Sequence, residues 1–351
     1  MEQDNGAWMV PGDERWVRAL RELSHDTYHT PEYVSVVAKH DGGEPACFLW
    51  QRDGRAFLLP LVLKPQRNGF GSPPNWRDGF SPYGYASPLV PENASAEELR
   101  SFFHAFKRSG AEQDLVTAFI RLHPLLPIPA ELLRTVGTLV HHGATVYADL
   151  SESKDSLWKD MRKGWQHKVR GLERAGFQVG FDEWEQYRAF IRIYRESMQR
   201  VGAAEDYYFS DGYFEDLRTQ LGDRIHLVSI RAPSGEVAAA ALNLGTGEFL
   251  QGHLSGTLGP YMRLSPSVTL YHAGALWAKE QGFRFFHVGG GVGGSSSDSL
   301  FQFKTGFSRH RADTYTLRIV LNPHRYQWLL ERSGREGHDP SGWFPPYRAA
   351  S

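Results

Sequence analysis

The feature that most constrains the fold of this chain is an order of elements that occurs twice. In the first copy, residues 14–22 and 31–39 have apolar positions at helical spacing. Residues 45–64 follow as a strand, a turn at Asp53-Gly54 and a second strand. An Asp-Gly pair between two apolar runs is a strong signal for a hairpin. The first copy therefore reads as two helices followed by a β-hairpin.

The second copy repeats this order about 180 residues further along, with little identity between the copies. Residues 183–200 and 211–221 have helical spacing, and residues 225–247 form two apolar runs around a turn at Ser234-Gly235. This repetition predicts the duplication of one α/β unit with a mixed sheet flanked by helices. Two unrelated α+β domains are the alternative interpretation of the same pattern.

Two domains also suit the length of 351 residues, because single hydrophobic cores stop growing at about 250–300 residues. A strand-like run that ends the first copy places the boundary near Val146. We therefore expect a first domain at residues 1–146 and a second at residues 147–321. Residues 322–351 are expected to pack back on the first domain.

The composition excludes several classes of protein. The formal net charge is -1, so contact with nucleic acid would need a local basic patch. The single cysteine, Cys47, excludes internal disulfides and a cysteine-based zinc site. His141 and His142 are adjacent, which points their rings apart on a strand, and we expect no metal site. The acidic N-terminal stretch and the lack of long apolar runs predict a soluble cytosolic protein without membrane insertion.

A local basic patch does occur within residues 156–177. Apolar residues recur there at spacings of three and four, which predicts one apolar helical face: Trp158, Met161, Trp165, Val169 and Leu172. Cationic side chains occupy the rest of the helix, and the candidates for contact with RNA phosphates are Arg162, Lys163, Lys168, Arg170 and Arg174. A solvated helix face without a partner is the alternative interpretation.

A glycine-rich segment, "HVGGGVGGSSSDSLFQFKTGF", covers residues 287–307. Gly289, Gly291 and Gly294 satisfy the spacing G-x-G-x-x-G after a strand-like run. A dinucleotide site also needs a long helix that opens at the third glycine, and here a polar serine-rich spacer follows. We therefore interpret this segment as a turn beyond a strand.

The end of the same segment carries a lysine among phenylalanines. Leu300, Phe303 and Phe307 share one helical face, which leaves Lys304 beside the rings rather than opposite them. The sequence therefore predicts a partly desolvated ammonium group at Lys304.

Several segments together resemble the Fem family of aminoacyl-tRNA-dependent transferases. They are "SPYGYASPLV", "SMQRVG", the helix that follows "LSP", the glycine-rich segment with "LFQFKTGF", and "VLNP". The resemblance covers nearly the whole chain and is strongest at residues 254–323. It implies an α/β (α+β) fold of two tandem GNAT-like domains, that is, domains like the acyl-CoA N-acyltransferases, which agrees with the duplication.

The resemblance also implies which residues act. Phe303 and Lys304 of the F-K-x-x-F segment are expected at the reaction centre, where the ammonium would stabilise the oxyanion formed when an amine attacks an aminoacyl ester. The candidate substrate-binding residues in the matched segments are Tyr83, Tyr85, Arg200, Tyr207, Tyr208, Phe209, Tyr213, His253 and Ser255.

The donor implied by the resemblance is charged tRNA, with no bound cofactor. Acyl-CoA-using GNAT enzymes carry a glycine-containing loop whose amides hold the pyrophosphate at a helix start. Here that helix start reads "MRLSPSVTL" without glycine. Ser265 is the expected N-cap, and Pro266, which has no amide hydrogen, suits the first helical position. Acetyl-CoA is therefore the alternative donor.

The acceptor departs from the family pattern. In peptidoglycan-building relatives an arginine shortly before a Tyr-Phe pair holds the phosphate of the cell-wall precursor. Tyr213 matches the tyrosine, but Phe209 stands at the place of the arginine. Related enzymes join amino acids from tRNA to small amines in antibiotic biosynthesis, and aromatic residues at Tyr207, Tyr208 and Phe209 favour such an acceptor. A peptidoglycan precursor is the alternative.

Overall fold

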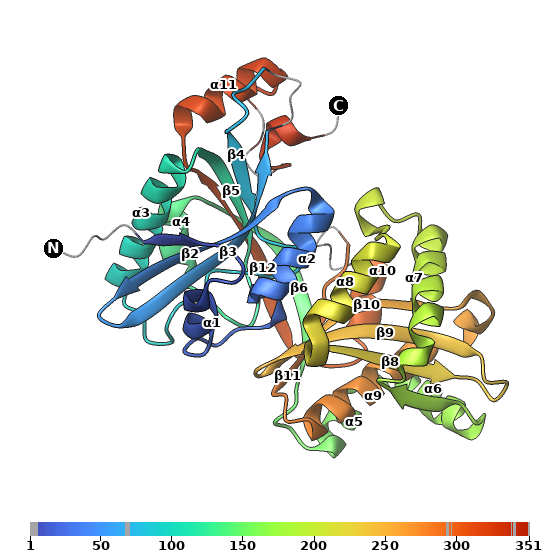
Figure 1. Cartoon of the computed structure of the whole chain (residues 1–351). Helices are drawn as coiled ribbons and strands as arrows, with labels where there is room; N and C mark the ends of the chain where they lie inside the picture. The colour runs from blue at the N-terminus through green and yellow to red at the C-terminus, as the bar shows by residue number, and fades with distance from the viewer. Residues whose placement is uncertain are drawn as a thin grey trace. The chain divides into compact units, whose positions relative to one another are not determined.

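The computed structural model of this chain describes residues 6–66, 71–292, 295, 297–337, 339 and 342–349. The chain divides into two compact units, which are drawn in Figure 1: Met1–His142 with Thr314–Ser351, and Gly143–Asp313. The third glycine of the G-x-G-x-x-G spacing, Gly294, lies outside the described residues.

The first unit is an α/β unit built around six strands in the order β1-β2-β3-β4-β5-β12. Its elements are β1 (Ala7–Met9), α1 (Glu14–Leu20), α2 (Pro31–Asp41), β2 (Glu44–Arg52), β3 (Arg55–Pro65), β4 (Arg77–Phe80), α3 (Ala96–Glu112), β5 (Leu115–Arg121), α4 (Ala130–Val136), the start of β6 (Thr138–Asp149), the end of β12 (Arg311–Val320) and α11 (Pro323–Ser333). Neighbouring strands are antiparallel except for β4 and β5, which are parallel. The sheet is therefore mixed, as predicted.

The main core of the first unit lies between α3, α4 and one sheet face. Helix α3 begins with a capping box in which Ser95 and Glu98 each accept a backbone N–H of the other residue. Its apolar side contributes Phe102, Phe103 and Phe106, which are buried against side chains of β2, β3, β5 and β12. The aromatic run of this helix therefore fixes which sheet face is covered.

The predicted hairpin turn at Asp53-Gly54 is confirmed. Both residues have positive φ, 51° and 76°, and Arg52 pairs directly with Arg55. Two consecutive positive φ angles are the signature of a type I′ turn, for which Asp-Gly is a preferred pair.

The C-terminal segment is tied to the first unit by one buried carboxylate. Asp78 of β4 accepts hydrogen bonds from the hydroxyls of Tyr347 and Thr117 (both 2.7 Å), from Nε of Arg348 (2.6 Å) and from the Gln66 amide (2.7 Å). Residues 314–321, which we expected in the second domain, also belong to the first unit, because β12 pairs with β5 at 316–320.

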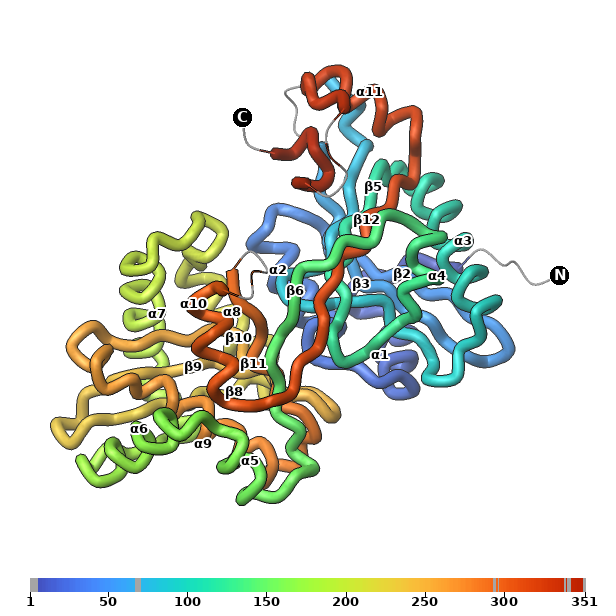
Figure 2. The backbone as a smooth tube through the Cα atoms, turned by 180° about the vertical axis from the view of Figure 1, so that it is seen from behind, coloured from blue at the N-terminus to red at the C-terminus, as the bar shows by residue number. Residues whose placement is uncertain are grey.

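The second unit has six strands in the order β6-β11-β10-β9-β8-β7. Its further elements are α5 (Lys154–Asp160), α6 (Lys163–Arg174), β7 (Gln178–Phe181), α7 (Tyr187–Val201), α8 (Asp211–Leu221), β8 (Ile225–Arg231), β9 (Val237–Thr246), β10 (Phe249–Thr257), α9 (Pro266–Glu280), β11 (Phe285–Gly289) and α10 (Ser299–Lys304). Strands β10 and β11 are parallel, and the pairs β6–β11, β10–β9, β9–β8 and β8–β7 are antiparallel. In Figure 2 the start of β12 runs beside β6, and the Thr145 hydroxyl donates to the Ala312 carbonyl (3.1 Å).

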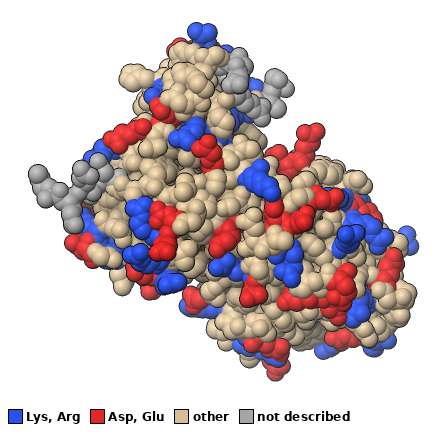
Figure 3. Space-filling model, in the orientation of Figure 1, with Lys and Arg blue, Asp and Glu red and all other residues tan. Residues whose placement is uncertain are grey.

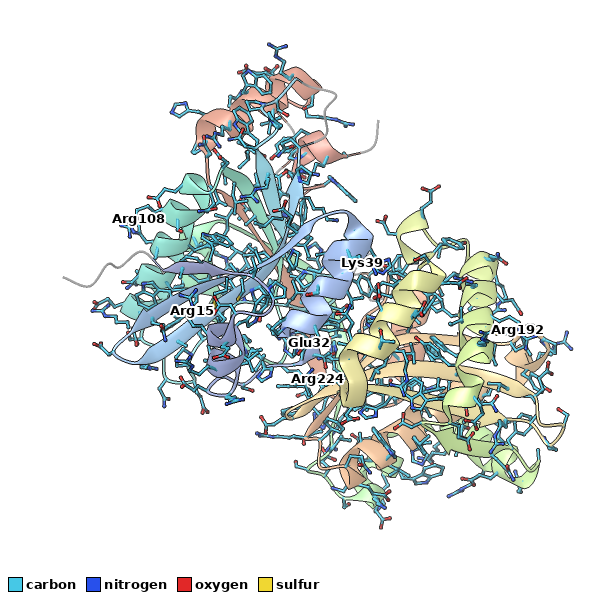
Figure 4. All side chains as sticks on the ribbon, viewed as in Figure 1. Arg15, Glu32, Lys39, Arg108, Arg192 and Arg224 are labelled. Carbon is cyan, nitrogen blue, oxygen red and sulfur yellow. The ribbon has the colours of Figure 1, made fainter. Side chains whose placement is uncertain are left out.

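The helices of the second unit lie against these strands. Helix α7 contacts β9 and β10, whereas α9 contacts β8, β9, β10 and β11, and α6 packs on α9. Figure 4 shows the side chains that fill the space between helices and strands, with Arg192 on the exposed side of α7. The order of α7, α8, β8 and β9 matches that of α1, α2, β2 and β3, so the predicted repetition of elements is confirmed.

The predicted start of α9 is correct, but its predicted N-cap is not. Helix α9 begins at Pro266, yet Ser265 has a left-handed conformation (φ 52°) and its side chain caps no backbone amide. Its hydroxyl instead accepts from Nζ of Lys168 (2.5 Å). The Ser265 side chain thus bonds to Lys168 of α6 instead of capping the first turn of α9.

Charges of both signs are mixed over the surface that Figure 3 shows, in line with the net charge of -1. In the described parts of the chain, every helix is too short or too polar to cross a membrane.

Candidate active site

The F-K-x-x-F segment forms the short helix α10 and the turn after it. Oδ1 of Asp298 accepts from the amides of Phe301 (2.8 Å) and Val292 (3.2 Å). One carboxylate therefore joins the end of the glycine-rich turn to the start of the helix. The helix presents Phe303 and Lys304 in its last turn.

Phe303 belongs to an aromatic cluster that joins three helices. Its ring centroid lies 5.3 Å from that of Trp165, 5.2 Å from Phe307 and 6.2 Å from Tyr271. A Cβ atom on Gly306 would collide with the Trp165 indole, so this close approach requires glycine. The cluster holds α10 against α6 and α9.

Lys304 is held by the glycine-rich turn beside it. Its Nζ donates to the Gly290 carbonyl (2.8 Å), and a Cβ on Gly289 would lie only 3.1 Å from this nitrogen. Gly289 also has a positive φ of 81°. The lack of a side chain on Gly289 thus leaves room for the Lys304 ammonium, and the Gly290 carbonyl accepts its hydrogen bond.

The surroundings of Lys304 weaken its hold on the proton. Burial lowers the pKa of this lysine to about 8, and the nearby charge of Asp298 opposes the shift. The side chain is still partly exposed. An ammonium in this position is poorly hydrated, so it interacts strongly with a negative charge that develops next to it.

The basic segment is two helices rather than the single predicted helix, because the backbone of Met161 and Arg162 is extended between α5 and α6. The apolar face is confirmed, with Met161, Val169 and Leu172 buried. The exposed face carries Arg162, Lys163, Arg170 and Arg174, with Lys168 half-buried beside it. Among the residues that the structure describes, no carboxylate forms an ion pair with these five.

Arg162 connects this basic face to the F-K-x-x-F segment. Its amide donates to the Gly306 carbonyl (2.9 Å), and its guanidinium donates to the Thr305 hydroxyl (3.0 Å) and the Gln302 carbonyl (3.4 Å). The helix that could meet RNA phosphates is therefore bonded to the residues next to Lys304.

A second polar group lies at the middle of β10. The register of β10 against β9 shifts at His253, which marks a β-bulge. The Tyr213 hydroxyl lies 3.3 Å from Nε2 of His253, and the Phe209 ring stacks on Tyr213 at 4.2 Å. Burial lowers the pKa of His253 to about 3, so its imidazole is neutral at pH 7.

Tyr271 is a site residue that the sequence interpretation missed. Ser255 forms a side-chain hydrogen bond with the Tyr271 hydroxyl, whose pKa is raised by burial. The Tyr271 ring lies 4.8 Å from Phe307. Ser255 thus reaches the aromatic cluster through Tyr271. Tyr271 lies in the apolar helix α9, and this position gave no sign of such a role.

The other candidate residues are spread over both units. Arg200 donates to the Thr257 carbonyl (2.8 Å) at the end of β10. Tyr207 and Tyr208 are 40% and 42% exposed, whereas Phe209 turns inward. In the first unit, the Tyr83 carbonyl accepts from the Tyr33 hydroxyl (2.7 Å), and Tyr85 contacts the rings of Tyr28 and His123.

Three residues of the second unit have side chains of the kinds that bind metals. Ligand-type atoms of Glu152, Asp160 and His310 lie within 4.8 Å of one another. The Arg309 guanidinium already contacts both carboxylates, at 3.0 Å and 3.4 Å. We therefore interpret this group as a surface ion-pair cluster.

Comparison with known proteins places this site in a known fold. Residues 159–304 match the family model described as the acetyltransferase (GNAT) domain, and no curated protein matches the sequence. The crystal structure of FemX is 14% identical, covers 92% of this chain and 99% of its own, and has a TM-score of 0.73.

Two lysylphosphatidylglycerol synthetase structures are also similar in fold. The structure of L-PGS from Bacillus licheniformis is 13% identical, with 92% of this chain and 96% of its own covered and a TM-score of 0.55. The C-terminal domain of a putative lysylphosphatidylglycerol synthetase from Agrobacterium fabrum is also 13% identical. This comparison covers 92% of this chain and 94% of the other, with a TM-score of 0.53. The chain therefore has the expected Fem-like GNAT fold. Together with the family match, this fold indicates an acyltransferase.

Proposed function

We propose that this chain transfers an aminoacyl group from charged tRNA to the amino group of a small molecule, and so forms an amide bond. The observation that carries the proposal is the link between two features. A poorly hydrated ammonium at Lys304 lies in the same segment that Arg162, at the start of the basic helix α6, holds by three hydrogen bonds.

The chemistry needs only positioning and charge stabilisation. The amine attacks the carbonyl carbon of the aminoacyl ester, which forms a C–N bond and a tetrahedral oxyanion. The C–O bond to the tRNA then breaks, and the proton lost by the amine balances the charge on the released 3′ oxygen. Lys304 stabilises the oxyanion in this account, an effect worth about 2.7–4 kcal/mol for comparable donors.

The start of α9 supports tRNA as the donor in preference to acyl-CoA. A CoA pyrophosphate would need free amides at this helix start. Here Pro266 has no amide hydrogen, Ser265 has a left-handed conformation, and Nζ of Lys168 contacts the Ser265 hydroxyl. This helix start thus lacks the free backbone amides that usually bind a pyrophosphate. Because charged tRNA is used in the cytoplasm, we place the enzyme there.

The surroundings of Tyr213 support a small amine as the acceptor. Phe209 occupies the place of the phosphate-binding arginine of peptidoglycan-building relatives, and its ring stacks on Tyr213 rather than offering a charge. The neutral His253 imidazole lies beside the Tyr213 hydroxyl. Such a group of rings and neutral polar atoms fits a small molecule, as in antibiotic biosynthesis, better than a nucleotide-linked cell-wall precursor.

The basic helix gives the first test. Replacing Arg170 and Arg174 with glutamine is expected to weaken tRNA binding and to reduce the slope of log K against log salt by about 1.4–1.8, since each lost phosphate contact removes roughly 0.7–0.9 of a unit. Filter binding or fluorescence anisotropy at several salt concentrations measures the slope.

A matched pair of exposed arginines elsewhere in the second unit serves as the control. Arg188→Gln with Arg192→Gln removes the same charge from α7 and is expected to leave the slope nearly unchanged. Equal slopes for the α6 variant and the wild type would make this face an ordinary solvated surface.

A further inference from the structure

We propose that the first unit binds an oxyanion, the phosphate or carboxylate group of a small ligand, at the guanidinium of Arg121 beside Thr316 and His142. This proposal does not depend on the transfer reaction, because it concerns residues of the first unit and is tested by binding alone.

The backbone register brings these three residues together. Arg121, the last residue of β5, pairs directly with Thr316 of β12, and directly opposed residues of antiparallel strands share one sheet face. Nε2 of His142 on β6 lies 2.8 Å from the Thr316 hydroxyl. Figure 2 shows β5 and β12 adjacent in the first unit. Three strands thus offer hydrogen-bonding groups at one place.

The Arg121 side chain is held in position but has donors to spare. It is half-buried, and its guanidinium carbon lies 5.3 Å from the centroid of the Phe119 ring on the same strand face. Within the described residues, no carboxylate, carbonyl or hydroxyl accepts a hydrogen bond from this guanidinium. A half-buried guanidinium without an acceptor favours an anion from solution.

A second arginine adds positive charge to the same face. Arg318 lies two residues beyond Thr316 on β12 and is 5% exposed. Burial lowers the pKa of Arg318, and the charge of Asp339 opposes this shift. Burial also lowers the pKa of His142, and the charges of Arg318, His141 and Arg121 add to the effect. The three charges that act on His142 are therefore all positive.

The hydrogen-bonding groups of Arg121, Thr316 and His142 favour an oxyanion as the ligand. A guanidinium presents its donors as a planar fork that matches two oxygens of a phosphate or carboxylate. The Thr316 hydroxyl and a neutral His142 are bonded to each other, so together they have one donor left for the ligand, either the Thr316 O–H or the Nδ1–H of His142. A neutral acceptor would form weaker hydrogen bonds with this guanidinium, and a cationic ligand would be repelled by it.

Calorimetric titration of the full chain tests the proposal, with pyrophosphate in one arm and citrate in the other. We expect saturable binding in at least one arm. In Arg121→Gln the affinity is expected to fall by a factor of about ten or more, the loss expected for one charge-assisted hydrogen bond. The arm that binds identifies the source of the oxyanion.

Two further variants keep the test decisive. Arg134→Gln removes an exposed arginine of the same unit that is already paired with Glu131, and it is expected to bind like the wild type. Arg121→Lys keeps the charge without the fork, so intermediate affinity is expected, and it replaces Arg121→Gln if that variant does not fold. Lack of saturable binding in both arms, or equal affinity in the wild type and the Arg121 variant, overturns the proposal.

Discussion

Replacing Lys304 with methionine is expected to lower kcat by a factor of about 10² to 10³ with little change in KM, because the lost ammonium acts mainly in the transition state. Methionine keeps an apolar stem of similar length, so the variant is expected to fold. Steady-state kinetics with charged tRNA and an amine acceptor measure the effect, and circular dichroism checks the fold. A folded methionine variant with wild-type kcat would remove Lys304 from the reaction.

Two comparisons distinguish the charge of Lys304 from its shape. Lys304→Arg keeps a positive charge in a broader group, so partial activity is expected. The pKa of about 8 also predicts that kcat of the wild type falls as the pH rises through about 8, because the ammonium is lost there. The methionine variant has no such group, so this limb of its pH profile is expected to disappear.

Replacing Asp78 with asparagine is expected to destabilise the first unit by about 3–5 kcal/mol, the cost of breaking a buried ion pair from one side. The carboxylate accepts four hydrogen bonds, and the substitution leaves the largely buried Arg348 without its partner. Differential scanning calorimetry would show the transition of the first unit at a lower temperature.

A surface ion pair of the same unit provides the control for Asp78. Glu131 and Arg134 are 90% and 53% exposed, and pairs of this kind contribute about 0–1 kcal/mol. Glu131→Gln is therefore expected to leave the transition nearly unchanged. If Asp78→Asn behaved like this control, the carboxylate would not anchor the C-terminal segment.

Local patterns predicted the elements of this fold well. The Asp53-Gly54 turn, the start of α9 at Pro266 and the repeated helix and hairpin order follow from backbone preferences and from hydrophobic spacing, which act over a few residues. The approach of the Phe303 and Phe307 rings, whose centroids lie 5.2 Å apart, follows from the same spacing.

Contacts between distant segments could not be predicted in this way. The sequence gives no sign that Arg162 bonds the turn at Gly306, that Lys168 contacts Ser265, or that Tyr213 meets His253 across the unit. These contacts depend on how helices and strands pack. The same holds for the break between α5 and α6, where Arg162 turns toward the F-K-x-x-F segment.

The most direct test of the proposed function is a transfer assay with charged tRNA and candidate amines, with and without RNase treatment of the tRNA. We predict an amide product that forms with intact charged tRNA and disappears after RNase treatment or in Lys304→Met. An acylated product formed equally fast from acetyl-CoA and unaffected by RNase would contradict transfer from tRNA and identify the acyl-CoA alternative.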